Sequence, residues 1–224
     1  MVLVHPNNEG TLMVKKGSGL KTGAPRGLVP LFVLIVLSLS ACAANKGVVK
    51  PGYPEELENW TRTVKVFEGF ETRLYFSATY KSPSFRESYI DRYVEGYGLG
   101  ETYRSALIER ETEQGAGYNE FFFTAYTPVD EWNDFEKKES IWRLYLEDDT
   151  GARLAPVSIT KLDSSDAVLR EFFPYFDLWS SAYIVKFPKY APAGAEPIPG
   201  PDTASMRLIV TGVIGKGQLE WRLK

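Results

Sequence analysis

The sequence predicts a mainly β fold, in which about eight antiparallel strands form a sandwich with a two-helix insertion. Apolar and polar residues alternate with a period of two in several short stretches. Turn sequences such as residues 148–151 (DDTG) separate these stretches, and one long interruption carries helical periodicity instead. Short strands in this number and spacing indicate a sandwich of immunoglobulin-like type.

The alternation is clearest over residues 70–80. Phe70, Leu74 and Phe76 stand on one side of this stretch, while Glu71 and Arg73 stand on the other. Such a pattern predicts a strand with one buried face. The remaining strands are expected at residues 63–67, 120–126, 141–147, 153–161, 182–187, 206–211 and 218–223.

Residues 84–115 form the helical interruption. Ser84 and Glu87 have the spacing of a capping box, and apolar residues follow at helical intervals. Glycines near residues 96–100 end this helix, and a second helix is expected at residues 101–113. A shorter helix is expected at residues 166–172, and residues 189–204, rich in proline and alanine, are expected to form a long loop.

The N-terminal segment has the character of an export signal. Basic residues precede an apolar run at residues 28–39, which has roughly 12 residues, whereas a membrane-spanning helix needs about 20. We therefore expect residues 1–41 to be a signal peptide, in which residues 1–12 reflect either a start placed too early or a long n-region. Residues 42–58, which are polar and contain proline and glycine, are expected to be a tether to a domain at residues 59–224.

The end of the apolar run reads Leu39-Ser40-Ala41-Cys42. It resembles the lipobox of bacterial lipoproteins, in which an aliphatic residue and two small residues precede a cysteine. The resemblance implies cleavage before Cys42, acyl chains on Cys42 as a membrane anchor, and an address in the cell envelope. Ala43 in place of aspartate favours the outer membrane, facing the periplasm. The alternatives are an uncleaved anchor or an ordinary signal peptide with a chance cysteine.

Composition excludes several classes of activity. The only histidine, His5, and the only cysteine, Cys42, leave the expected domain without Ser-His-Asp or Cys-His catalysis and without Cys/His zinc sites. Residues 42–224 hold 22 basic and 28 acidic residues, a net charge of −6 that disfavours nucleic acid as a partner. We expect no cofactor and no metal, and no catalytic residue is assigned.

Aromatic residues supply the candidates for a binding surface, which are Trp132, Tyr175 and Trp179. Trp132 lies within an acidic cluster, and the other two belong to residues 172–179 (FFPYFDLW). Exposed, these side chains would form a recognition surface for a glycan or an envelope protein. Buried, they would be core, and we favour burial for residues 172–179 and for residues 121–123 (FFF).

The sequence thus predicts a lipid-anchored envelope protein without enzymatic activity, which binds another protein as an accessory or structural component. The alternatives are a glycan- or peptidoglycan-binding module and a carboxylate-dependent hydrolase. Exposed tryptophans in one concave patch would favour the glycan, and two facing carboxylates in a cleft would favour the hydrolase.

Lipidation can be tested with a palmitate analogue fed to growing cells. Wild type should incorporate the label, and Cys42→Ser should lose it, because the thiol is the expected acceptor. Unlabelled wild type, or label retained by Cys42→Ser, would contradict the lipobox prediction.

Overall fold

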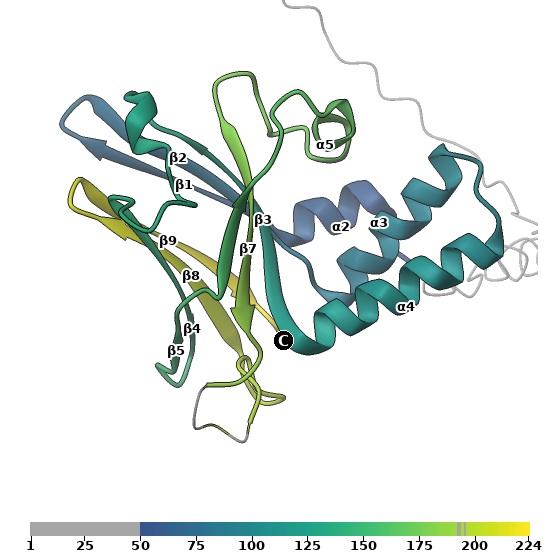
Figure 1. Cartoon of the computed structure of the whole chain (residues 1–224). Coiled ribbons are helices and arrows are strands. Elements are labelled where there is room, and N and C mark those ends of the chain that lie inside the picture. The colour runs from purple at the N-terminus through teal and green to yellow at the C-terminus, as the bar shows by residue number, and fades with distance from the viewer. Residues whose placement is uncertain (1–49, 192–193, 195) are drawn as a thin grey trace, which may run out of the picture. The chain divides into compact units, whose positions relative to one another are not determined.

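Two antiparallel β-sheets form the main part of the domain in a computed structural model that describes residues 50–191, 194 and 196–224 (Figure 1). The five-stranded sheet has the order β1-β2-β3-β7-β6, and the four-stranded sheet has the order β5-β4-β8-β9. The strands are β1 Thr61–Glu68, β2 Glu71–Tyr80, β3 Tyr118–Tyr126, β4 Trp142–Asp148, β5 Arg153–Leu154, β6 Ser158–Lys161, β7 Ser181–Pro188, β8 Ser205–Gly212 and β9 Gly215–Arg222.

The helices lie mostly between or before the strands of the five-stranded sheet. They are α2 Tyr53–Trp60, α3 Pro83–Gly96, α4 Glu101–Gly117, η2 Asp130–Trp132 and α5 Ala167–Phe172. The expected helical pair is therefore present as α3 and α4, between β2 and β3. Within the described residues, no helix combines the length and the hydropathy that crossing a membrane requires. The signal peptide, the lipobox and Cys42 lie outside the described residues.

The mainly β character and the two antiparallel sheets agree with the prediction, but the strand order differs from the immunoglobulin arrangement. In that arrangement the third strand lies in the opposite sheet from the first two. Here β1, β2 and β3 form a meander in one sheet. The period-2 pattern identifies strands without identifying their neighbours, which explains the difference.

A core of apolar side chains fills the space between the two sheets. Leu74 and Phe76 of β2 and Phe121 of β3 face Leu208 of β8 and Trp221 of β9, and all five are buried. The rings of Phe121 and Trp221 lie 5.2 Å apart between centroids. The alternation read from residues 70–80 thus reports the inward face of β2 correctly.

A second core lies on the outer face of the five-stranded sheet, beneath α2, α3 and α5. Phe122 points outward between the inward-facing Phe121 and Phe123, and its ring stacks on Phe173 with centroids 3.7 Å apart. This sheet is therefore buried on both faces at the position of β3, which explains three consecutive phenylalanines. Burial is confirmed for residues 121–123 and for Phe172, Phe173 and Phe176.

The edges of the two sheets meet at β1 and β9. Arg62 Nε donates to the carbonyl of Glu220 at 3.1 Å, and Trp221 Nε1 donates to the carbonyl of Trp60 at 2.7 Å. A Cβ added at Gly217 would lie 2.9 Å from a methyl group of Val64. Because that distance is shorter than a normal contact, glycine is what allows the two edges to approach so closely.

The N-terminal part of the domain departs from the prediction. Residues 53–60 form α2, so the expected tether at residues 42–58 is wrong from Tyr53 onward. Tyr53 is buried, and its hydroxyl donates to the carbonyl of Phe172 at 2.5 Å. Gly52 and Pro54 read as linker residues, but they serve as the N-cap and the first turn of this helix, where proline is well tolerated.

Two further boundaries differ. The N-cap of α3 is Ser82, whose Oγ accepts from the Phe85 amide at 3.1 Å, while the expected cap, Ser84, lies inside the helix. The single strand expected at residues 153–161 is instead β5 and β6, which belong to different sheets. Pro156 lies in the connection, where the chain leaves one sheet for the other, and proline cannot donate to a strand ladder.

The outer core predicts the cost of removing Phe122. Phe122→Ala should lower the free energy of unfolding by about 3–5 kcal/mol, because it leaves a cavity beneath Phe173. Denaturant unfolding measures this loss, and Val213→Ala, at a residue that is 88% exposed, is the matched control. The control should change stability by less than about 0.5 kcal/mol. Equal effects of the two substitutions would contradict the packing described here.

Candidate functional site

The structure separates the three candidate aromatic residues. Trp132 ends η2 and is half-buried, and its carbonyl accepts a hydrogen bond from Trp142 Nε1 at 3.0 Å. Tyr175 is half-buried and its hydroxyl hydrogen-bonds to Thr79 Oγ1 at 2.6 Å, so it belongs to the packing over β2. Burial raises the pKa of Tyr175. Trp179 is 78% exposed, so the burial predicted for residues 172–179 is wrong at this residue.

Trp179 lines a surface hollow of about 440 Å³, together with Tyr75, Tyr126, Asp177 and Ser180. We call these five residues the aromatic hollow. Tyr75 of β2 and Tyr126 of β3 are directly paired, and their rings lie 6.3 Å apart between centroids. Both point to the outer face of the five-stranded sheet, where α2, α3 and α5 do not pack against them.

The loop that carries Trp179 is held by one carboxylate oxygen. Asp177 Oδ1 accepts hydrogen bonds from the Trp179 amide at 2.9 Å and from the amide and the hydroxyl of Ser180, both at 2.8 Å. These bonds fix the backbone of Trp179 next to the start of β7. The exposed indole therefore stands on a defined turn, which reduces the ordering that a ligand would have to impose.

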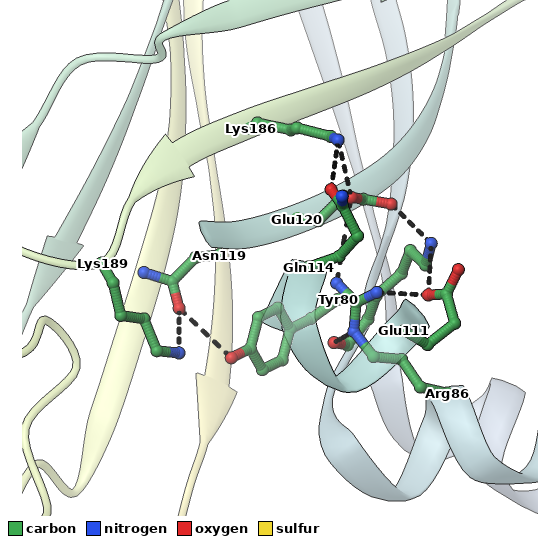
Figure 2. A network of polar contacts seen from close by, with 9 residues as sticks. Tyr80, Arg86, Glu111, Gln114, Asn119, Glu120, Lys186 and Lys189 are labelled. Carbon is green, nitrogen blue, oxygen red and sulfur yellow. Dashed lines mark hydrogen bonds and ion pairs between the residues drawn. The ribbon is translucent and has the colours of Figure 1, made fainter. Parts of the chain in front are cut away.

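A buried polar network joins the helical pair to the same sheet at its other end (Figure 2). At its centre is Glu120 of β3, whose side chain is 5% exposed. Lys81 Nζ lies 2.5 Å from Glu120 Oε1, and Lys186 Nζ of β7 and Arg86 Nη2 of α3 lie 3.5 and 3.9 Å from Glu120 Oε2. A single carboxylate is thus surrounded by three cations from three different segments.

Glu111 connects α4 to this network. Its Oε2 lies 3.2 Å from Lys81 Nζ and accepts a hydrogen bond from Arg86 Nη1. Burial opposes ionisation of Glu111, but the charges of Lys81 and Arg86 outweigh burial and lower its pKa. A general acid needs the opposite shift, so the surroundings of Glu111 favour its anionic form.

The network continues to Lys189, which follows β7. Lys189 Nζ donates to Asn119 Oδ1 at 2.9 Å, and the Tyr80 hydroxyl donates to the same oxygen at 3.3 Å. Burial lowers the pKa of Lys189, and the charge of Arg86 lowers it further. Within the described part of the chain, no carboxylate forms an ion pair with Lys189.

A cavity of about 390 Å³ adjoins the network between α3 and α4. Its charged lining includes Lys81, Arg86, Lys189 and Glu111, with Glu87 also present. Its remaining lining residues are mostly apolar or small: Tyr80, Pro83, Ile90, Ile108, Thr112, Gly115, Ala116 and Tyr118. The described residues contain no group of three His, Cys, Asp or Glu side chains placed to hold a metal ion.

The sequence named neither the network nor the partners of Trp179. One signal was visible: Asn119 and Glu120 are consecutive polar residues directly before the three phenylalanines of residues 121–123, and both are buried. Buried polar side chains require partners, so this pair pointed to a polar contact. The partners themselves come from segments far apart in the chain.

The network predicts a large effect of Glu120→Gln. This substitution removes the buried negative charge between Lys81, Arg86 and Lys186, so the free energy of unfolding at pH 7 should fall by about 3–5 kcal/mol. Denaturant unfolding measures this, with Glu113→Gln at an exposed position of α4 as the control. A loss below about 1 kcal/mol, or an equal loss in the control, would contradict the role assigned to Glu120.

Comparison with known proteins assigns neither a family nor a function to this chain. No protein-family model matches the chain, and no curated protein matches it. A solved structure from Burkholderia pseudomallei K96243, described as a novel protein of unknown function, is similar over 85% of this chain and 88% of its own chain. The TM-score is 0.34 and the sequence identity is 9%.

Proposed function

We propose that the chain is a lipid-anchored protein of the bacterial cell envelope, without enzymatic activity, that binds a glycan through the aromatic hollow. The anchor is Cys42, acylated after removal of residues 1–41, and the domain faces the periplasm from the outer membrane. The lipobox resemblance supports this address, and the absence of histidine after His5 supports a binding role over nucleophilic catalysis.

The observation that carries the binding proposal is Trp179, which is 78% exposed beside Tyr75 and Tyr126 in one hollow. An indole with this exposure loses the free energy that burial of its apolar surface would give. Its backbone is nevertheless fixed by Asp177. A large apolar side chain held in an exposed position by its own loop is typical of a contact residue for a ligand.

The composition of the aromatic hollow favours a sugar over a fully apolar ligand. Three aromatic side chains line the hollow, and the exposed indole of Trp179 offers a flat apolar face against which the C–H face of a pyranose ring can pack. Asp177 and Ser180 add oxygen atoms at the edge of the hollow, where sugar hydroxyl groups can exchange hydrogen bonds. The envelope glycan of suitable chemistry in the periplasm is the peptidoglycan strand.

The position of the hollow is compatible with a tethered protein. The chain enters the domain at α2, whose helix packs on the outer face of the sheet at the start of β1. Tyr75 pairs with Lys65 of β1. Lys65 lies four residues beyond Thr61, where β1 begins, and four strand residues span about 13 Å. The aromatic hollow is therefore set apart from α2, near which the described part of the domain begins.

The test is co-sedimentation of the purified full-length protein, kept soluble in detergent, with isolated peptidoglycan sacculi. Wild type should sediment with the sacculi in a saturable manner. Trp179→Ala should weaken binding about tenfold, equivalent to about 1.4 kcal/mol, because it removes the most exposed ring of the hollow.

Leu178→Ala is the matched control, since Leu178 is 80% exposed next to Trp179 but does not line the hollow. It should bind as wild type does. Failure of wild type to sediment would overturn the glycan proposal, as would equal binding by wild type and Trp179→Ala. Binding to sacculi only when envelope proteins remain attached would replace the glycan with a protein partner.

A further inference from the structure

The cavity between α3 and α4 is lined by more positive than negative charge. The polar network around it contains four cations, Lys81, Arg86, Lys186 and Lys189, and two carboxylates, Glu111 and Glu120. Glu87 also lines the cavity, but its side chain is 48% exposed and lies 2.7 Å from Lys50 Nζ, so its charge is already paired. A net charge of +2 is thus gathered at one place in a domain that is acidic as a whole.

This excess leaves hydrogen-bonding capacity unused. Arg86 Nη2 is buried without a hydrogen-bond partner among the described residues, because Glu120 Oε2 is 3.9 Å away and is shared with Lys186. Lys189 donates to a neutral amide oxygen and not to a carboxylate. A buried guanidinium nitrogen without a hydrogen-bond partner costs free energy, and a bound anion would lower that cost.

The rest of the cavity would not suit a small inorganic anion. Ile90 of α3, Ile108 and Ala116 of α4 and Pro83 give it apolar walls. Its volume of about 390 Å³ falls within the range of small-molecule sites, which are mostly apolar with a few placed polar groups. The lining therefore matches a ligand with one anionic end and one apolar end.

The attachment of α4 offers a route into the cavity. None of the residues of α4 is buried, so little apolar packing holds this helix in place. Ion pairs hold this helix instead. Arg104 Nη2 lies 2.7 Å from Asp91 Oδ1, and Glu111 Oε2 lies 3.2 Å from Lys81 Nζ. A helix held by polar contacts at its surface separates from its neighbour at lower cost than one sealed by an apolar face.

We propose that the cavity between α3 and α4 binds a small organic carboxylate with an aliphatic body. The carboxylate lies by Lys81, Arg86 and Lys189, and the aliphatic part packs against Ile90 and Ile108. This site is separate from the aromatic hollow and does not depend on the glycan proposal, since the two share no lining residue.

Isothermal titration calorimetry tests the site with hexanoate and with hexan-1-ol, its neutral counterpart. The full-length protein is held in lipid nanodiscs, and the heat of titrating empty nanodiscs is subtracted. Hexanoate should bind saturably at millimolar concentration, and hexan-1-ol should bind at least tenfold more weakly. Saturable binding of both with similar affinity would overturn the assignment of a carboxylate, and absence of hexanoate binding would overturn the site.

Two pairs of variants separate the site from general effects of charge and fold. Lys189→Met should weaken hexanoate binding at least tenfold, whereas Lys216→Met, which removes an equal charge at an exposed position of β9 outside the network, should change it less than twofold. Ala116→Trp should abolish binding by filling the cavity, while Ala106→Trp on the exposed part of α4 should not. Equal effects within either pair would overturn the proposal, and thermal unfolding of each variant verifies that it is folded.

Discussion

The buried carboxylate of Glu120 is the interaction on which the joining of helices and sheet depends. It lies on β3 with 5% of its side chain exposed and draws together cations from the end of β2, from α3 and from β7. Without that negative charge, three cations would lie close together in a poorly solvated region, where their repulsion is strong. Because α4 contributes no buried residue, polar contacts hold this helix on the domain, among them the ion pairs of Glu111 with Lys81 and of Arg104 with Asp91.

The apolar packing is arranged around the same strand. β3 has a buried face toward the four-stranded sheet and a second buried face toward the helices, so Phe121, Phe122 and Phe123 contribute to two separate cores. The helices cover only part of the outer face, however. Tyr126, at the far end of β3, lies beyond that cover and lines the aromatic hollow with Tyr75. One strand therefore links the charged network, both cores and the exposed aromatic surface.

The alternation of apolar and polar residues predicted most of the strands and helices. Which of them lie next to one another depends on contacts between residues far apart in the chain, and this alternation does not report such contacts. The alternation in residues 70–80 identified β2, but Phe70 falls in the turn after Gly69 and is fully exposed. The same alternation in residues 153–161 continued across Pro156, although the chain changes sheets there. Trp179 was named as a candidate from its residue type. Its neighbours Tyr75 and Tyr126 were not, because cross-strand register brings them together from positions about 50 and 100 residues away.

The meeting of β1 and β9 has a consequence for how this domain can associate with other chains. These two strands are outer strands of their sheets, and glycines of β9 allow them to shield each other. The remaining outer strands, β5 and β6, have two and four residues. Little unpaired backbone is therefore offered for an incoming strand to extend either sheet. We therefore expect this domain to recognise other molecules through side chains on its surface. The shielded edge strands also protect the domain against intermolecular β-aggregation.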